Sequence, residues 1–339
     1  MYHPNTKKMK VKNAIQIREN SLRSQYTKLK EVLEEYRNYN NPEFAEDFRK
    51  HAVLSCLHIE GNRRFVDITD VENPNSIKLA SIKGKTKRLL STFAAEYRVN
   101  ENGLILMQKS ITGETPEFRK HKYMIQRCNL SDDMISIKRA CGNEAHHPIH
   151  QFINFCNSSK PENGADVFID MMIQNFILMY IQPFEDSNDL SRVLPNSYGN
   201  NNEAYLNALF INAIRFNRDE YWKRLLSCQY SNGTDITNFL DFMIEKTIKE
   251  IEIYFKVTNR RLTPRERELL FTYYHSNADT LQKLFNAYNM QNMPTETGHL
   301  FKITESLRSK GVLDYGDTTG RKVNKHLEDR QVLLLEKAS

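Results

Sequence analysis

Hydrophobic positions recur at helical spacing along most of the chain, and the clearest stripe lies near the N-terminus. Its members follow one another at intervals of seven, four, three, four and three residues, which predicts one long amphipathic helix. They are Ile15, Leu22, Tyr26, Leu29, Leu33 and Tyr36. Because only about three heptads are visible, a helix packed on the body of the protein is favoured over a coiled coil. Further helices are predicted over 42–60, 76–97, 104–110, 165–181, 202–216, 218–228 and 236–256.

Two stretches depart from this amphipathic pattern. Residues 165–181 are apolar nearly all round, with Asp166, Asp170 and Gln174 on one row, so this helix is expected at the centre of a helical domain. The segments 122–127 and 134–139 flank a polar turn and predict a β-hairpin, the one strand pair expected before residue 260. The fold class predicted is therefore mainly α with one hairpin.

A second unit is predicted to begin near Leu262. The tetrapeptide Thr263-Pro264-Arg265-Glu266 places an N-cap, a proline at the first helical position and a capping glutamate in sequence. Three helices are expected over 264–275, 279–289 and 295–310, followed by two short strands around a turn at 316–320. This order is that of a winged helix-turn-helix. The domains predicted are an N-terminal helical arm (1–40), a helical domain (41–260) and the winged helix-turn-helix (261–335).

Composition and charge narrow the classes of function. With 339 residues, 40% hydrophobic and 27% charged, the chain is globular, and it holds no apolar run near the roughly 20 residues of a membrane span. The polar N-terminus shows no secretory h-region, and five scattered cysteines without a CxxC suit reduced thiols, so a cytoplasmic protein without a membrane partner is expected. Residues 1–40 carry nine Lys/Arg against four Glu, an arm that could meet nucleic acid or an acidic partner but is more often a solvated face.

Two short segments partly match a phosphate-binding motif and a metal-binding motif, and both matches are incomplete. Lys83-Gly84-Lys85-Thr86 ends like a phosphate-binding loop, but Leu79 stands where the first glycine belongs and no apolar strand precedes it. His146, His147 and His150 lack the partners of a metal motif and are interpreted as incidental histidines of a loop.

The informative segment is 182–193, a polar turn directly after the apolar helix. Backbone amides at the start of the next helix would favour an anion there, although spacing alone favours an ordinary inter-helix loop capped by Asp186 or Asn188. The segment resembles the signature of the Fic family, His-Pro-Phe-x-Asp/Glu-Gly-Asn-Gly-Arg-x-x-Arg. Other parts of the chain resemble the same family in order. They are 56–62 (the inhibitory-helix motif, with Cys56 at the Ser/Thr place), the hairpin after Phe118-Arg119 (the target-docking flap), 217–222, 235–240 and the C-terminal winged helix.

The resemblance implies a Fic-type helical domain with a hairpin flap, and a loop that transfers AMP from ATP to a protein hydroxyl. In the family the histidine is the general base, the acidic residue holds Mg²⁺, and the glycines, asparagine and arginines bind phosphates. The implied site residues here are Gln182 at the base position, Asp186 for the metal, and Ser187, Asn188 and Arg192 for the nucleotide. The implied cofactors are ATP and Mg²⁺.

The chain departs from the signature where the chemistry is most demanding. The replacements are Gln182 for the base, Ser187 and Asp189 for glycines, and Leu190 and Val193 for arginines, with Arg192 one residue early. A glutamine amide cannot take a proton near neutral pH, and losing a positioned base costs about 10²–10⁴ in rate. Leu190 removes a cation and Asp189 adds an anion beside developing phosphate charge. The sequence therefore predicts weak or no AMP transfer.

Glu60 matches the inhibitory glutamate of the family, which pairs with the second arginine of the loop. Val193 removes that partner, unless Arg192 replaces it. Glu60 is then either an exposed helix end or has found another contact, and the sequence leaves both open.

The charge of the predicted winged helix bears on whether it binds nucleic acid. Residues 261–339 hold twelve Lys/Arg and ten Asp/Glu, which is a thin footprint for phosphate neutralisation, although Arg321 and Lys322 in the wing could contact a backbone. A protein contact or a homodimer is favoured over nucleic acid.

Three hypotheses follow. The leading one is a Fic-fold protein with a degenerate transfer loop that acts as a binding or regulatory protein. The alternatives are an active protein adenylyltransferase with an unrecognised base, and a transcriptional regulator that binds DNA through the winged helix. Whether the chain is an enzyme is thus left open.

Overall fold

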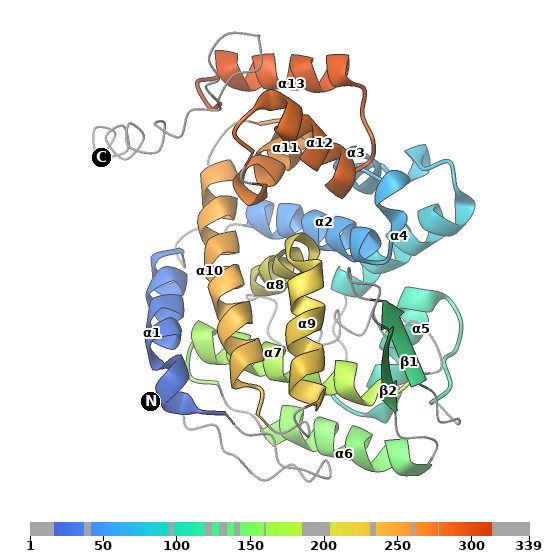
Figure 1. Ribbon diagram of the computed structural model, residues 1–339. Coiled ribbons are helices and arrows are strands. Elements are labelled where there is room, and N and C mark those ends of the chain that lie inside the picture. The colour runs from blue at the N-terminus through green and yellow to red at the C-terminus, as the bar shows by residue number, and fades with distance from the viewer. Residues whose placement is uncertain are drawn as a thin grey trace. The chain divides into compact units, whose positions relative to one another are not determined.

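The computed structural model is mainly helical and forms two compact units (Figure 1). The first comprises Met1–Glu60 and Lys78–Ile251, and the second Gly61–Ile77 and Glu252–Ser339. The residues that the structure describes are 17–36, 42–94, 98–118, 124–128, 134–138, 143–158, 161–184, 204–230, 235–258, 262–276 and 278–313. The mainly α fold class predicted from the sequence is confirmed.

The first unit is a helical domain with one hairpin. Its elements are α1 (Glu19–Tyr36), α2 (Pro42–Ile59), α4 (Ala80–Ala94), α5 (Glu101–Thr112), β1 (Met124–Cys128), β2 (Met134–Lys138), α6 (Asn143–Ser158), α7 (Gly164–Ile181), α8 (Ala204–Phe216), α9 (Arg218–Tyr230) and α10 (Thr237–Thr258), the last of which continues into the second unit. The strands pair antiparallel, with Gln126 opposite Ser136. The role of this hairpin as a flap stays a prediction.

Two predicted helices and one predicted loop in this unit differ from the structure. The helix expected over 76–97 begins at Ala80, and the one expected over 104–110 is longer, because Asn100 caps it and Gly113 ends it with φ 87°. The histidines at 146, 147 and 150 lie on α6 and not in a loop. His150 pairs with Glu101 on α5 at 3.4 Å.

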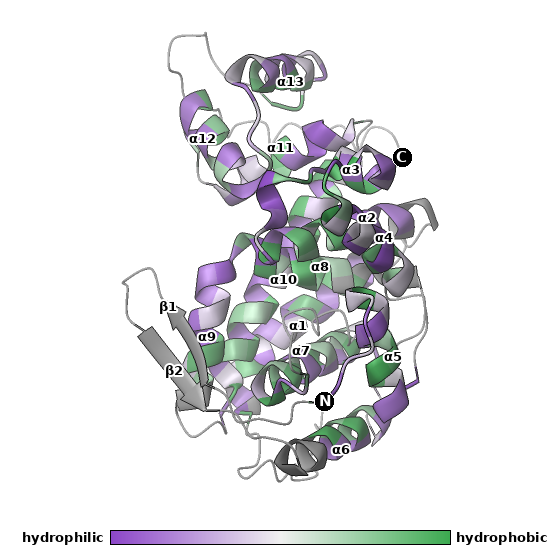
Figure 2. Cartoon of the chain, turned by 90° about the vertical axis from the view of Figure 1, so that its right-hand side faces the viewer, coloured by the Kyte–Doolittle hydropathy of each residue, from purple (hydrophilic) through white to green (hydrophobic). Residues whose placement is uncertain are grey.

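Helix α7 lies at the centre of the first unit, as its all-round apolar pattern predicts. Asn163 caps it by accepting from the amides of Ala165 and Asp166, and Phe168, Phe176 and most of their neighbours on the helix are buried. Within the described residues α7 is the one helix long and apolar enough to cross a membrane, and 83% of it is buried in the protein. Figure 2 shows the hydrophobic colour concentrated on α7, α8 and the helices against them. This burial is that of a core helix.

The N-terminal helix packs on the body, as predicted. Leu22, Leu29 and Leu33 of α1 are buried. The hydroxyl of Tyr26 donates to Asp166 on α7 at 2.7 Å. The amphipathic stripe therefore belongs to an intramolecular interface.

The second unit contains α11 (Pro264–His275), α12 (Leu281–Gln291) and α13 (Thr297–Ser309), together with α3 (Ile68–Glu72) from a distant part of the sequence. The capping box of Thr263 and Glu266 is present at the start of α11. On α13, Leu300, Ile303 and Leu307 are buried. The strands of the predicted wing, with Arg321 and Lys322, lie outside the described residues.

The segment 61–77 is the main feature that the sequence analysis did not anticipate. It follows α2 directly, yet it clusters with the C-terminal helices. Two short 3₁₀ turns, Asn62–Arg64 and Pro74–Ser76, flank α3, and the side chains of Val66, Ile68 and Val71 are buried. The C-terminal unit is therefore built from two separate stretches of the chain.

Candidate functional site

Gln182 ends the central helix in an unusual backbone conformation. It has φ 47° and ψ 72°, and its N–H donates to the carbonyl of Leu178 at 2.8 Å. Among the described residues it is the one non-glycine with positive φ, and its side chain is only 3% exposed. This left-handed conformation costs a non-glycine residue about 1–2 kcal/mol. Such outliers gather at functional sites, where the surrounding structure maintains them.

The two residues after Gln182 bring the loop next to the lead into the hairpin. Phe184 is fully buried and forms an antiparallel bridge with Phe118. Their rings stack with centroids 5.5 Å apart and an angle of 11° between the planes. The start of the loop and the segment before β1 thus lie side by side. The rest of the loop, including Asp186, Ser187, Asn188 and Arg192, lies outside the described residues.

Glu60 has a partner that the sequence analysis missed. It stands one residue beyond the end of α2, and its Oε2 lies 2.5 Å from Nζ of Lys85 on α4. The side chains are 13% and 25% exposed, so Glu60 is not an exposed helix end. Lys85 belongs to the tetrapeptide that ends like a phosphate-binding loop, which is helical in the structure. No local pattern signals this pair, because it joins two helices by tertiary contact.

A buried polar network fixes α8, the helix that follows the loop, against α2. The hydroxyl of Ser55, which is fully buried, donates to Oδ1 of Asn212 at 2.5 Å. Arg215 donates from Nη1 to the same hydroxyl at 3.5 Å and stacks over the ring of Phe216. Buried groups paired in this way hold one arrangement of the two helices. The helices that precede and follow the undescribed residues 185–203, α7 and α8, are thus both packed within the first unit.

Metal and thiol chemistry find no support in the part of the chain that the structure describes. No group of three or more His, Cys, Asp or Glu side chains is arranged to hold a metal ion there. Burial, with Asp170 nearby, raises the pKa of the Cys156 thiol far above its usual value, and a thiol in such an environment is a poor nucleophile. Mg²⁺ binding by Asp186 stays a prediction.

Most cations of the C-terminal helices already contact carboxylates. Lys310 donates to Glu266 at 2.7 Å, and Arg265 donates to Asp67 at 2.8 Å. Arg308 lies 3.9 Å from Glu305. The described part of this unit therefore offers few free charges to a phosphate backbone.

No protein-family model matches the chain, and no curated protein matches it. Among solved structures, it is similar to the crystal structure of a Fic family protein from Desulfovibrio desulfuricans G20 at 2.70 Å resolution. The TM-score is 0.58 at 13% sequence identity, and the match covers 89% of this chain and 95% of that one. The chain therefore has the Fic fold, which confirms the resemblance seen in the sequence at the level of the fold.

Proposed function

We propose that this Fic-fold protein has lost efficient AMP transfer and acts as a binding or regulatory protein in the cytoplasm. The observation that carries the proposal is Gln182. By the sequence resemblance Gln182 matches the base position of the signature; it follows the last residue of the central helix, and it is buried. A neutral amide there can accept a hydrogen bond but cannot accept the proton of an attacking hydroxyl near neutral pH.

The remaining departures from the signature also lower the expected rate of AMP transfer. Leu190 and Val193 replace cations that balance charge on the transferred phosphate, and Asp189 adds an anion nearby. The loss of the base alone accounts for about 10²–10⁴ in rate. Nucleotide binding through Asp186, Asn188 and Arg192 is part of the proposal, because binding needs no base.

The partner proposed is a protein. Because Arg265 and Lys310 form ion pairs, the C-terminal helices present little positive charge, whereas stable binding to DNA needs several contacts with phosphates. A homodimer through this unit is compatible with the same surface.

The test is transfer of label from ATP. The purified full-length chain is incubated with Mg²⁺ and α-labelled ATP, alone and with cell lysate, and protein-bound label is measured. We expect no label on any protein beyond the background of a heat-denatured sample. Gln182→His is expected to recover only a fraction of ordinary activity, because the arginine and glycine positions stay replaced.

Two controls make the outcome decisive. γ-labelled ATP separates phosphate transfer from AMP transfer, and Gln182→Ala removes the amide without adding a base. Strong α-label transfer by the wild-type chain, lost in Gln182→Ala, would overturn the proposal. Titration of the same preparations with ATP in a calorimeter distinguishes a loop that binds nucleotide from one that does not.

A further inference from the structure

An exposed basic and aromatic turn opens the second unit. Arg63 and Arg64 lie in the 3₁₀ turn that follows Gly61, and the N–H of Phe65 closes it by donating to the carbonyl of Asn62 at 3.0 Å. All three side chains after Asn62 are exposed, and the phenyl ring is 52% accessible. We call residues 63–65 the Arg-Arg-Phe turn.

The turn is held firmly on both sides. Gly61 adopts φ 91°, a conformation suited to glycine, at its start. After it, Val66 is fully buried and Asp67 caps α3 by accepting from the amides of Thr69 and Asp70. The turn is thus presented in one conformation, which lowers the entropy lost on binding.

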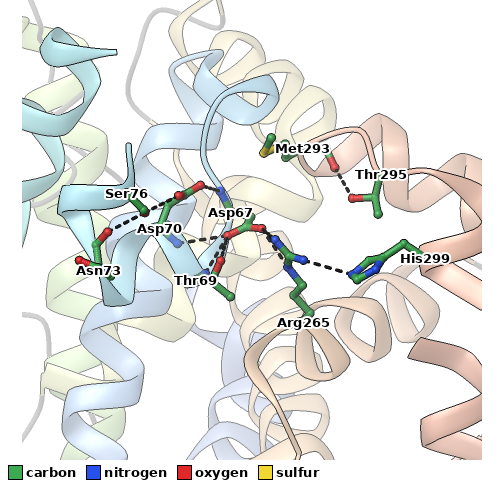
Figure 3. A network of polar contacts seen from close by, with 9 residues as sticks. All are labelled: Asp67, Thr69, Asp70, Asn73, Ser76, Arg265, Met293, Thr295 and His299. Atoms are coloured by element: carbon green, nitrogen blue, oxygen red, sulfur yellow. Dashed lines mark hydrogen bonds and ion pairs between the residues drawn. The ribbon is translucent and has the colours of Figure 1, made fainter. Parts of the chain in front are cut away.

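Asp67 also ties the turn to the C-terminal helices. Its Oδ2 accepts from Nη2 of Arg265 at 2.8 Å and from Nε at 3.1 Å, and Nη1 of the same guanidinium lies 3.1 Å from Nε2 of His299 (Figure 3). The two N–H bonds to one carboxylate fix the position of the chain directly after the turn.

The arginines of the turn differ from their neighbours in having no carboxylate. Arg265 and Lys310 contact Asp67 and Glu266, whereas Arg63 and Arg64 form no hydrogen bond or ion pair within the described residues. Among the described residues, two exposed arginines without an ion-pair partner are therefore followed directly in sequence by an exposed phenylalanine.

We infer that the Arg-Arg-Phe turn docks an acidic segment of a partner protein, in which carboxylates flank an aromatic or aliphatic side chain. Guanidinium groups bind carboxylates in a bidentate manner, and the exposed ring of Phe65, which follows the two arginines, offers apolar area in the same turn. Arginine and aromatic residues are enriched where protein partners bind. This inference rests on the proposed function as a binding protein and names the chemistry of its partner.

Charge arithmetic favours a protein segment over nucleic acid. Two free arginines would neutralise about two phosphates, whereas proteins that hold DNA firmly make about 6–10 phosphate contacts. A pair of carboxylates, in contrast, balances the charge of both guanidinium groups.

The test is fluorescence anisotropy with the full-length chain. The probe is a fluorescein-labelled peptide with two aspartates on each side of a phenylalanine. We expect saturable binding that weakens at least 10-fold in the double variant Arg63→Glu/Arg64→Glu and several-fold in Phe65→Ser. The matched control is Lys302→Glu, because Lys302 is an exposed cation of the same unit on α13, and it should leave the affinity unchanged. A peptide with asparagine in place of aspartate should not bind.

A second variant separates docking from folding. Asp67→Ala removes the anchor but keeps all three docking residues, so it should weaken binding less than the double charge reversal. Equal affinity of the wild type and the charge-reversed variant, or no binding by the wild type, overturns the inference. Tighter binding of labelled oligothymidylate than of the peptide, lost in the charge-reversed variant, also overturns it in favour of nucleic acid. The AMP-transfer assay is independent of this result, so the two proposals can fail separately.

Discussion

Replacing Lys85 by methionine tests the ion pair that holds Glu60. The side chains are 13% and 25% exposed, so the pair lies between a surface ion pair and a fully buried one. Removing one partner costs about 3–5 kcal/mol in a buried pair, and surface pairs contribute about 0–1 kcal/mol. Discounted for the residual solvent at both groups, Lys85→Met should lower the free energy of unfolding by about 1–3 kcal/mol.

A double-mutant cycle identifies the cause of that loss. Glu60→Gln in the Lys85→Met background removes the unpaired carboxylate, so it should restore part of the stability. We expect a coupling energy of about 1–2 kcal/mol between the two positions.

Urea unfolding followed by tryptophan fluorescence is the assay. The chain contains one tryptophan, Trp222, which lies on α9 in the first unit together with the pair, so the signal reports this unit. The control is Arg49→Met on α2, which breaks a more exposed pair with Glu46 and should cost less than about 1 kcal/mol. If Lys85→Met costs no more than Arg49→Met, or if the coupling energy is zero, the pair does not hold Glu60 in place.

Three further predictions concern stability. A Cβ added at Gly61 or at Gly298 would meet no atom within 4 Å, but Gly61 has φ 91°. Gly61→Ala should therefore lower the free energy of unfolding of the second unit by about 1 kcal/mol or more, and with it the melting temperature. Gly298→Ala should leave the melting temperature unchanged or raise it. Burial acts to raise the pKa of Glu266, but hydrogen bonds from Lys310 and other donors outweigh it, so the pKa lies below 4.5. The stabilisation from this carboxylate is therefore present above pH 4.5 and is lost as the pH falls through the lowered pKa. In Glu266→Gln, the free energy of unfolding should depend less on pH in this acid range. Burial and the hydrogen bond to Asp166 on α7 raise the pKa of Tyr26 to about 12. The stabilisation from the Tyr26 hydroxyl is therefore present below pH 10 and is lost between pH 10 and 12. Tyr26→Phe should remove that loss from a curve of stability against alkaline pH, and it should lower the free energy of unfolding at neutral pH by about 1 kcal/mol.

Local sequence patterns predicted much of the fold. The tetrapeptide that begins at Thr263 predicted the start of α11, and the stripe through Leu22 and Leu33 predicted the buried face of α1. The all-round apolar pattern of residues 165–181 predicted the central place of α7. These signals succeed because capping and helical periodicity depend on residues a few positions apart.

Helix α6 shows where local signals mislead. It contains Pro148 and two adjacent histidines, which suggested a loop, although a helix there buries Ile149 and Phe152. The apolar spacing of three residues was the usable signal. Tertiary burial outweighed the unfavourable propensity of proline within the helix.

The candidate site was predictable only in part. The position of Gln182 at the end of the central helix followed from the sequence, but its left-handed backbone did not, because glutamine rarely adopts that conformation. The pair of Glu60 with Lys85 and the docking of segment 61–77 on α11 join positions far apart in sequence. Such contacts carry no periodic signal, so sequence alone could not reveal them.

The most direct test of the proposed loss of AMP transfer is the rate at which the protein releases pyrophosphate from ATP. Transfer of AMP to any acceptor, water included, breaks the bond between the α- and β-phosphates and releases pyrophosphate, so the measurement needs no known target. Pyrophosphate is measured with a coupled enzymatic assay after incubation with Mg–ATP. We expect the wild-type chain to release pyrophosphate no faster than buffer alone. Release well above that background, abolished in Gln182→Ala, would contradict the proposal.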